Sequence, residues 1–178
     1  PPRPITLLLG GAKINTKINL IDHYIGIADQ ILIGGGMAFT LLKARGIDVG
    51  KSIIDESKIS SARELIEKAK KKKNLFFPKD VVCSKSIEQS ASSKIYDITK
   101  IPNGQMGLDI GPKTIDSFSN LISNSKTVIW NGPMGVFELD NFHNGTKSLA
   151  KHIASCSEGE LISIIGGGDT ALEEALYL

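Results

Sequence analysis

The stretch that decides the fold is ITLLLGGAKINTK, residues 5–17 of a 178-residue chain. Its first five residues are apolar or β-branched without the alternation of a half-exposed strand, which is typical of a parallel strand buried on both faces. Two glycines end this run, and a polar segment with lysines at positions 13 and 17 follows them. A buried strand, a glycine turn and a helix in this order indicate an α/β fold.

The same alternation of apolar runs and amphipathic segments continues along the chain. Strands are predicted at residues 5–9, 30–33, 75–77, 81–83, 95–98, 127–130 and 161–165. Helices are predicted at residues 16–28, 37–44, 57–73, 114–124, 145–156 and 170–178. Right-handed crossovers between parallel strands place helices on both faces of the sheet. The prediction is one three-layer, Rossmann-like α/β domain with a mostly parallel sheet, over residues 1–178.

Composition excludes several classes of function. The net charge is +2 and aromatic residues make up 6%, which argues against nucleic acid as a partner. No apolar run approaches the roughly 20 residues that a membrane span needs. Two cysteines far apart in the sequence and no visible signal peptide favour a reducing, cytoplasmic location.

Four of the predicted strands are followed by glycine-rich turns. The turns are Gly10-Gly11, Gly34-Gly35-Gly36, residues 131–135 (NGPMG) and residues 166–169 (GGGD). In a parallel sheet these turns meet at the carboxyl edge, where ligands of open α/β sheets bind. Glycine allows the backbone to approach a ligand, and the amides of helix N-termini attract anions. Four such turns at one edge indicate a ligand that carries phosphate.

Charged residues beside the turns add to this pattern. Lys13 and Lys17 are four residues apart, so a helix would place both on one face at its positive end. The helix dipole disfavours cations there unless an anion is bound, although two exposed lysines are the alternative. Asp169 is either an N-cap or a carboxylate for Mg²⁺. Glu138 either accepts from a ribose hydroxyl or is solvated.

Two segments of the sequence partly match named phosphate-binding motifs. Gly50-Lys51-Ser52 resembles the end of a P-loop, but Arg45 stands where the first glycine is required, so this motif is rejected. Residues 166–171 fit the G-x-G-x-x-A dinucleotide pattern, which keeps a dinucleotide-binding oxidoreductase domain as an alternative. A non-catalytic α/β module, whose glycines only form tight turns, is a third hypothesis.

Five blocks of the sequence together resemble the phosphoglycerate kinase family, in its C-terminal, nucleotide-binding half. They occur in the family's order along nearly the whole chain. The blocks are residues 10–17 (GGAKINTK), 34–40 (GGGMAFT), 107–112 (GLDIGP), 130–138 (WNGPMGVFE) and 166–170 (GGGDT).

The resemblance implies a phosphotransferase of glycolysis. The family transfers a phosphoryl group between 1,3-bisphosphoglycerate and MgADP, which gives 3-phosphoglycerate and MgATP. We expect the chain to lack the N-terminal domain that binds the acid substrates, and a final C-terminal segment. Because the family closes two domains over both substrates, the isolated chain is predicted to be inactive. The full-length protein is expected to be a monomer.

The resemblance also implies roles for individual residues. Lys17 would bind nucleotide phosphate, Lys13 would face the transferred group, and Asp169 would bind the Mg²⁺ that accompanies ADP or ATP. The remaining nucleotide-binding residues would be Ala12; Gly35, Gly36, Gly107 and Leu108 around adenine, with Ile53 nearby; Glu138 at the ribose, with Asn131, Gly132, Pro133 and Gly135 beside it; and Gly167, Gly168 and Thr170 at the phosphates.

Overall fold

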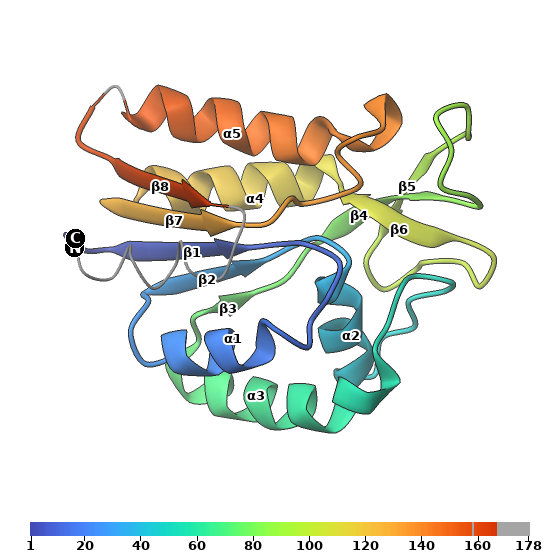
Figure 1. Ribbon diagram of the computed structural model, residues 1–178, viewed down its shortest axis with the longest axis horizontal. Coiled ribbons are helices and arrows are strands. Elements are labelled where there is room, and N and C mark those ends of the chain that lie inside the picture. The colour runs from blue at the N-terminus through green and yellow to red at the C-terminus, as the bar shows by residue number, and fades with distance from the viewer. Residues whose placement is uncertain (158, 167–178) are drawn as a thin grey trace.

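A five-stranded sheet forms the centre of the structure, a computed structural model that describes residues 1–157 and 159–166 (Figure 1). Every neighbouring pair in this sheet is parallel, as the sequence predicts. The strand order is β3 (Leu75–Phe76), β2 (Gln30–Ile33), β1 (Ile5–Leu9), β7 (Thr127–Asn131) and β8 (Ile162–Gly166). The carboxyl ends of β1, β2 and β7 therefore lie side by side at one edge.

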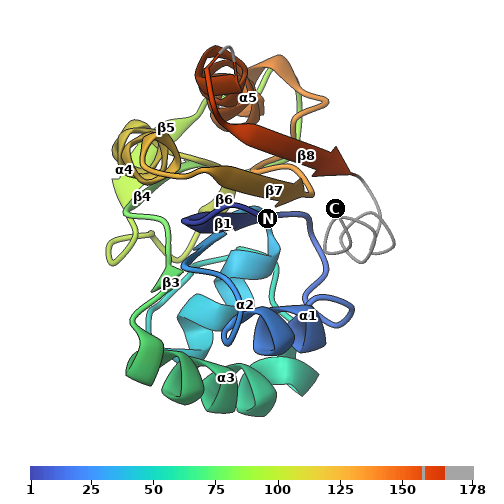
Figure 2. The same cartoon turned by 90° about the vertical axis from the view of Figure 1, so that its left-hand side faces the viewer.

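Helices cover both faces of this sheet (Figure 2). On one face lie α1 (Ile18–Tyr24), α2 (Met37–Ala44) and α3 (Ile59–Lys72), and on the other α4 (Pro112–Ser123) and α5 (Asn144–Ser157). Leu7 and Leu9 of β1 belong to the apolar cluster of the first face, whereas Leu8 belongs to that of the second. This alternation confirms the three-layer prediction. Within the described ranges, no helix has the length and apolarity to cross a membrane.

A second, antiparallel sheet of three strands packs at the end of the first. It consists of β5 (Lys94–Asp97), β4 (Asp80–Ser84) and β6 (Met106–Ile110), in that order. The apolar pattern of the sequence predicts β4 and β5 but not β6. The sequence of β6, MGLDI, places a glycine and an aspartate inside a buried strand, and both residue types are depleted in strands.

The first helix is shorter than predicted. The sequence predicts a helix over residues 16–28, but α1 spans only Ile18–Tyr24. The carbonyl of Ile14 accepts the amides of Lys17 and Ile18 at 2.9 Å each, so a tight turn separates Lys13 from the helix. The prediction that Lys13 and Lys17 share a helical face is therefore wrong. The helix predicted at residues 170–178 lies outside the described residues.

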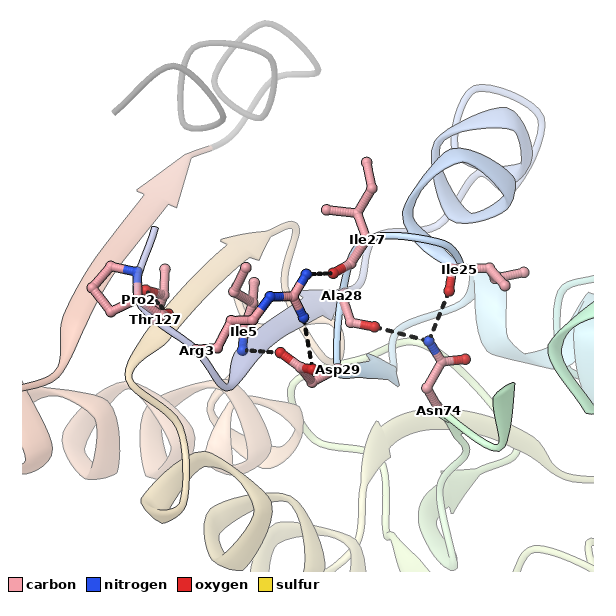
Figure 3. A network of polar contacts seen from close by, with 9 residues as sticks. All are labelled: Pro2, Arg3, Ile5, Ile25, Ile27, Ala28, Asp29, Asn74 and Thr127. Atoms are coloured by element: carbon pink, nitrogen blue, oxygen red, sulfur yellow. Dashed lines mark hydrogen bonds and ion pairs between the residues drawn. The ribbon is translucent and has the colours of Figure 1, made fainter. Parts of the chain in front are cut away.

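Polar contacts fix the opposite, amino edge of the main sheet (Figure 3). Asp29 accepts a hydrogen bond from the Arg3 guanidinium and one from the Ile5 amide, both at 2.7 Å. The buried side chain of Asn74 donates to two carbonyl oxygens of the segment after α1, at 3.0 and 2.9 Å. These contacts join the start of β1 to the segments that lead into β2 and β3.

The two cysteines are expected to differ sharply in reactivity. Cys83, on β4, is 0% exposed, and burial raises the pKa of its thiol to about 12. Cys156 lies partly exposed on α5. Only the thiolate reacts, so we expect Ellman's reagent at pH 8 to modify one thiol per native chain and the second only in guanidinium. A Cys156→Ser chain is the control, and rapid reaction of its native form would contradict the assignment.

Candidate functional site

Three glycine turns at the carboxyl edge are bound to one another through their backbones. Amide-to-carbonyl hydrogen bonds of 2.8–3.1 Å run from Gly10 to Asn131, from Gly11 to Pro133, from Gly35 to Met134 and from Met37 to Gly11. The prediction that these turns meet at one edge is therefore confirmed for the turns after β1, β2 and β7. Of the fourth turn, residues 167–169 lie outside the described residues. The result is one rigid frame built from three separate parts of the sequence.

Gly35 occupies the centre of this frame. Its φ of +66° is in the left-handed region, and a Cβ there would lie 2.5 Å from the Gly11 nitrogen and 2.8 Å from the Pro133 oxygen. Only glycine accommodates both the backbone angle and this close approach. The glycines therefore do more than form tight connections, because they let three backbones touch.

A cavity of about 790 Å³ opens between this frame and the three-stranded sheet. The turns after β1 and β2, residues 133–138 and strand β6 all contribute to its lining. The predicted site residues that line it are Ala12, Gly35, Gly36, Ile53, Gly107, Leu108, Pro133, Gly135 and Glu138. Its volume is in the range of small-molecule sites, roughly 300–1,000 Å³.

Other residues of the cavity were not predicted. Phe39, Lys51 and Asp109 all line it. Phe39 lies on α2, a helix that is buried along nearly its whole length, where an apolar side chain normally indicates core. Lys51 comes from the segment rejected as a P-loop, and no strand precedes that segment. Its amide donates to the Gln105 carbonyl at 2.7 Å, a long-range contact of which the local sequence gives no sign.

Lys17 lies at the junction of the first and third turns. The residue is 9% exposed, and its ammonium group donates to Oδ1 of Asn131. Its Nζ is 3.8 Å from the position that a Cβ would occupy at Gly11. A cation held this far out of water, beside backbone turns at a sheet edge, is suited to an anionic ligand.

Lys13 lies apart from Lys17. It is exposed and lines a second, smaller cavity of about 430 Å³, together with Asp55 and Glu56. Ala12 and Ile53 line both cavities, so the two are adjacent. The structure thus places Lys17 against the frame, where it lines neither of these two cavities, and Lys13 at the neighbouring opening.

The remaining predicted residues are placed as follows. Gly132 lines a third cavity of about 400 Å³, on the Trp130 side of the same turn. Gly167, Gly168, Asp169 and Thr170 lie outside the described residues. Within residues 1–157 and 159–166, no group of three or more His, Cys, Asp or Glu side chains could hold a metal ion.

Asp109 is the unusual charged group of the main cavity. It is 4% exposed, and burial raises the pKa of its carboxyl group to about 7, although hydrogen bonds from the Gly145 and Ile110 amides oppose the shift. The carboxyl group therefore changes its charge close to neutral pH.

Comparison with known proteins decides the family. The family model described as phosphoglycerate kinase matches residues 1–175. The chain belongs to the phosphoglycerate kinase family. Its sequence is 49% identical over 179 residues to a phosphoglycerate kinase of Prochlorococcus marinus (strain MIT 9515), covering 98% of this chain and 44% of that protein. It is 47% identical over 171 residues to "Phosphoglycerate kinase 3, cytosolic" of Arabidopsis thaliana, covering 96% and 43%.

Solved structures agree with this assignment. The phosphoglycerate kinase of Coxiella burnetii matches with a TM-score of 0.89 at 35% identity, covering 98% of this chain and 45% of that one. The enzyme of Pyrococcus horikoshii, at 23% identity and a TM-score of 0.72, shares the fold. The chain thus spans less than half the length of the phosphoglycerate kinases that it matches.

Proposed function

We propose that this chain is the nucleotide-binding part of a phosphoglycerate kinase and that its main cavity binds MgADP and MgATP. The observation that carries the proposal is the frame of three hydrogen-bonded glycine turns, which borders a cavity of about 790 Å³ in a chain of this family. We assign the acid substrates, 1,3-bisphosphoglycerate and 3-phosphoglycerate, to the remainder of the full-length enzyme. We propose that this chain, without that remainder, does not catalyse phosphoryl transfer.

The proposed orientation follows from the chemistry of the two ends of the cavity. Gly35, Gly36, Gly107 and Leu108 all line the cavity, and this apolar lining suits adenine. Glu138, which also lines the cavity, would accept hydrogen bonds from the ribose hydroxyls. The phosphates would then extend toward Lys17 and the glycine turn after β1.

Phosphoryl transfer depends on positioning and on neutralising charge rather than on a covalent nucleophile. In this proposal the ammonium group of Lys17, oriented by Asn131, compensates charge on the bound nucleotide. Lys13, in the adjacent opening, approaches the group that is transferred. Asp169 would supply a carboxylate oxygen, the kind of ligand that Mg²⁺ prefers, and the ion would neutralise phosphate charge when it is bound with the nucleotide.

We propose that the full-length protein is a monomeric enzyme of glycolysis and that it is located in the cytoplasm. A relative from Arabidopsis thaliana is named cytosolic, which supports the proposed location.

Calorimetric titration with MgADP tests the proposal. We expect saturable binding at one site, weakened about tenfold or more in Lys17→Ala, because a charge-assisted contact contributes about 1.5–3 kcal/mol. Lys71→Ala, on the exposed side of α3, is the matched control and should bind like the wild type. A folded chain that binds no MgADP contradicts the proposal, and preferential binding of NADH would favour a dinucleotide site.

A further inference from the structure

We infer that Asp109 is a positioning residue for the nucleoside end of the cavity. Its carboxylate joins strand β6, the loop of residues 133–138 and the first turn of α5 into one wall. This inference rests on the proposed nucleotide site, because the wall matters for binding only if a nucleoside lies against it.

The carboxylate fixes the start of α5 from a distant part of the sequence. Oδ2 of Asp109 accepts the amide of Gly145 at 2.8 Å, and Oδ1 accepts the amide of Ile110 at 2.9 Å. Gly145 is the second residue of α5, so its amide is one of those that have no partner within the helix. The carboxylate also lies at the positive end of the helix dipole, which favours a negative charge.

The same carboxylate supports the loop that faces the cavity. A Cβ at Gly135 would lie 2.5 Å from Oδ1 of Asp109 and 2.5 Å from the carbonyl oxygen of Leu108. The amide of Val136 donates to that carbonyl at 2.8 Å. Gly135 therefore packs directly on Asp109, and the loop that carries Glu138 is held in register with Leu108.

Asp80 is a second buried aspartate that caps a helix, but it does not support the cavity. It lies on β4 in the same three-stranded sheet and is 2% exposed. It accepts the amides of Thr114 and Lys113, at 2.9 and 3.0 Å, and so caps α4. Unlike Asp109, it does not line the cavity. The two aspartates share burial and capping, and differ in contact with the cavity.

The test compares Asp109→Asn with Asp80→Asn as folded proteins. An asparagine keeps the shape but has one acceptor oxygen, so either the Gly145 or the Ile110 amide loses its partner. We expect the Kd for MgADP and for adenosine to rise about tenfold in Asp109→Asn and less than twofold in Asp80→Asn. The Kd for pyrophosphate should not change in Asp109→Asn, because pyrophosphate occupies only the phosphate end.

A second variant keeps the test decisive if Asp109→Asn does not fold. Gly145→Ala replaces no residue that lines the cavity but places a methyl group against Oδ1 of Asp109 and the side chain of Ile110. It should also weaken adenosine binding more than pyrophosphate binding. Equal affinities in wild type and in these variants, or equal losses for adenosine and pyrophosphate, would overturn the inference alone. A wild-type chain that does not bind MgADP would overturn the proposed function and the inference with it.

Discussion

A Gly35→Ala chain is expected to be less stable than the wild type by about 3 kcal/mol or more and to lose MgADP binding. The substitution forces alanine to a φ of +66° and places its methyl group 2.5 Å from the Gly11 nitrogen. The atoms in the way are backbone atoms of the other two turns, which cannot rotate aside. Relief of the contact requires the frame itself to open, and urea unfolding measures the cost.

Gly46→Ala is the matched control for this experiment. Gly46 also has a positive φ, of +82°, but no atom lies within 4 Å of its Cβ position. Its replacement should therefore cost only the backbone strain, roughly 1–2 kcal/mol, and leave MgADP binding unchanged. Equal losses of stability in the two variants would show that the contact between the turns has no role.

The free energy of unfolding should contain a contribution from Asp109 that falls as the pH rises from 5 to 8. In the folded chain its pKa is about 7, against an ordinary value of 3.8. Between these two values the folded state holds a proton that the unfolded state has released. Stability therefore decreases with rising pH in this window, by up to about 1.4 kcal/mol per pH unit, and the decrease ends above pH 7.

Urea unfolding of the wild type and of Asp109→Asn at pH 5, 6, 7 and 8 isolates this contribution. The stability of the wild type relative to the variant should be greatest at pH 5 and should decline toward pH 8. Other groups titrate in both proteins and cancel in the difference. A difference that is constant with pH, or that grows as the pH rises, would contradict the raised pKa.

Local sequence was sufficient to predict the parts of the fold in which burial leaves a clear pattern. The run ITLLL at residues 5–9 is buried throughout, and β1 forms where predicted. The strand β6 was missed because Asp109 serves as a helix cap, a reason for burial that depends on α5, 36 residues away. The helix predicted over residues 16–28 was too long because turns replace it at residues 15–17 and 25–27. At its far end, the carbonyl groups of Ile25 and Ala28 accept the side chain of Asn74, a long-range contact that the local sequence does not record.

Local sequence also predicted only part of the candidate site. Glycine turns after buried strands predict which segments meet, and the frame confirms this for Gly11, Gly35 and Pro133. The spacing of Lys13 and Lys17 predicts a shared helical face, but the chain is not helical between them. Residues such as Lys51 reach the cavity through long-range contacts, which no local pattern records.

The central claim is that a nucleotide binds in the cavity between the glycine frame and β6. Amide chemical shifts of the ¹⁵N-labelled 178-residue chain, titrated with MgADP, test it most directly. We expect the amides of Gly35, Gly36, Gly107 and Gly135 to shift in a saturable way, while those outside the cavity, at Gly26 and Gly46, do not. Unchanged spectra, or shifts confined to residues outside the cavity, would contradict the account.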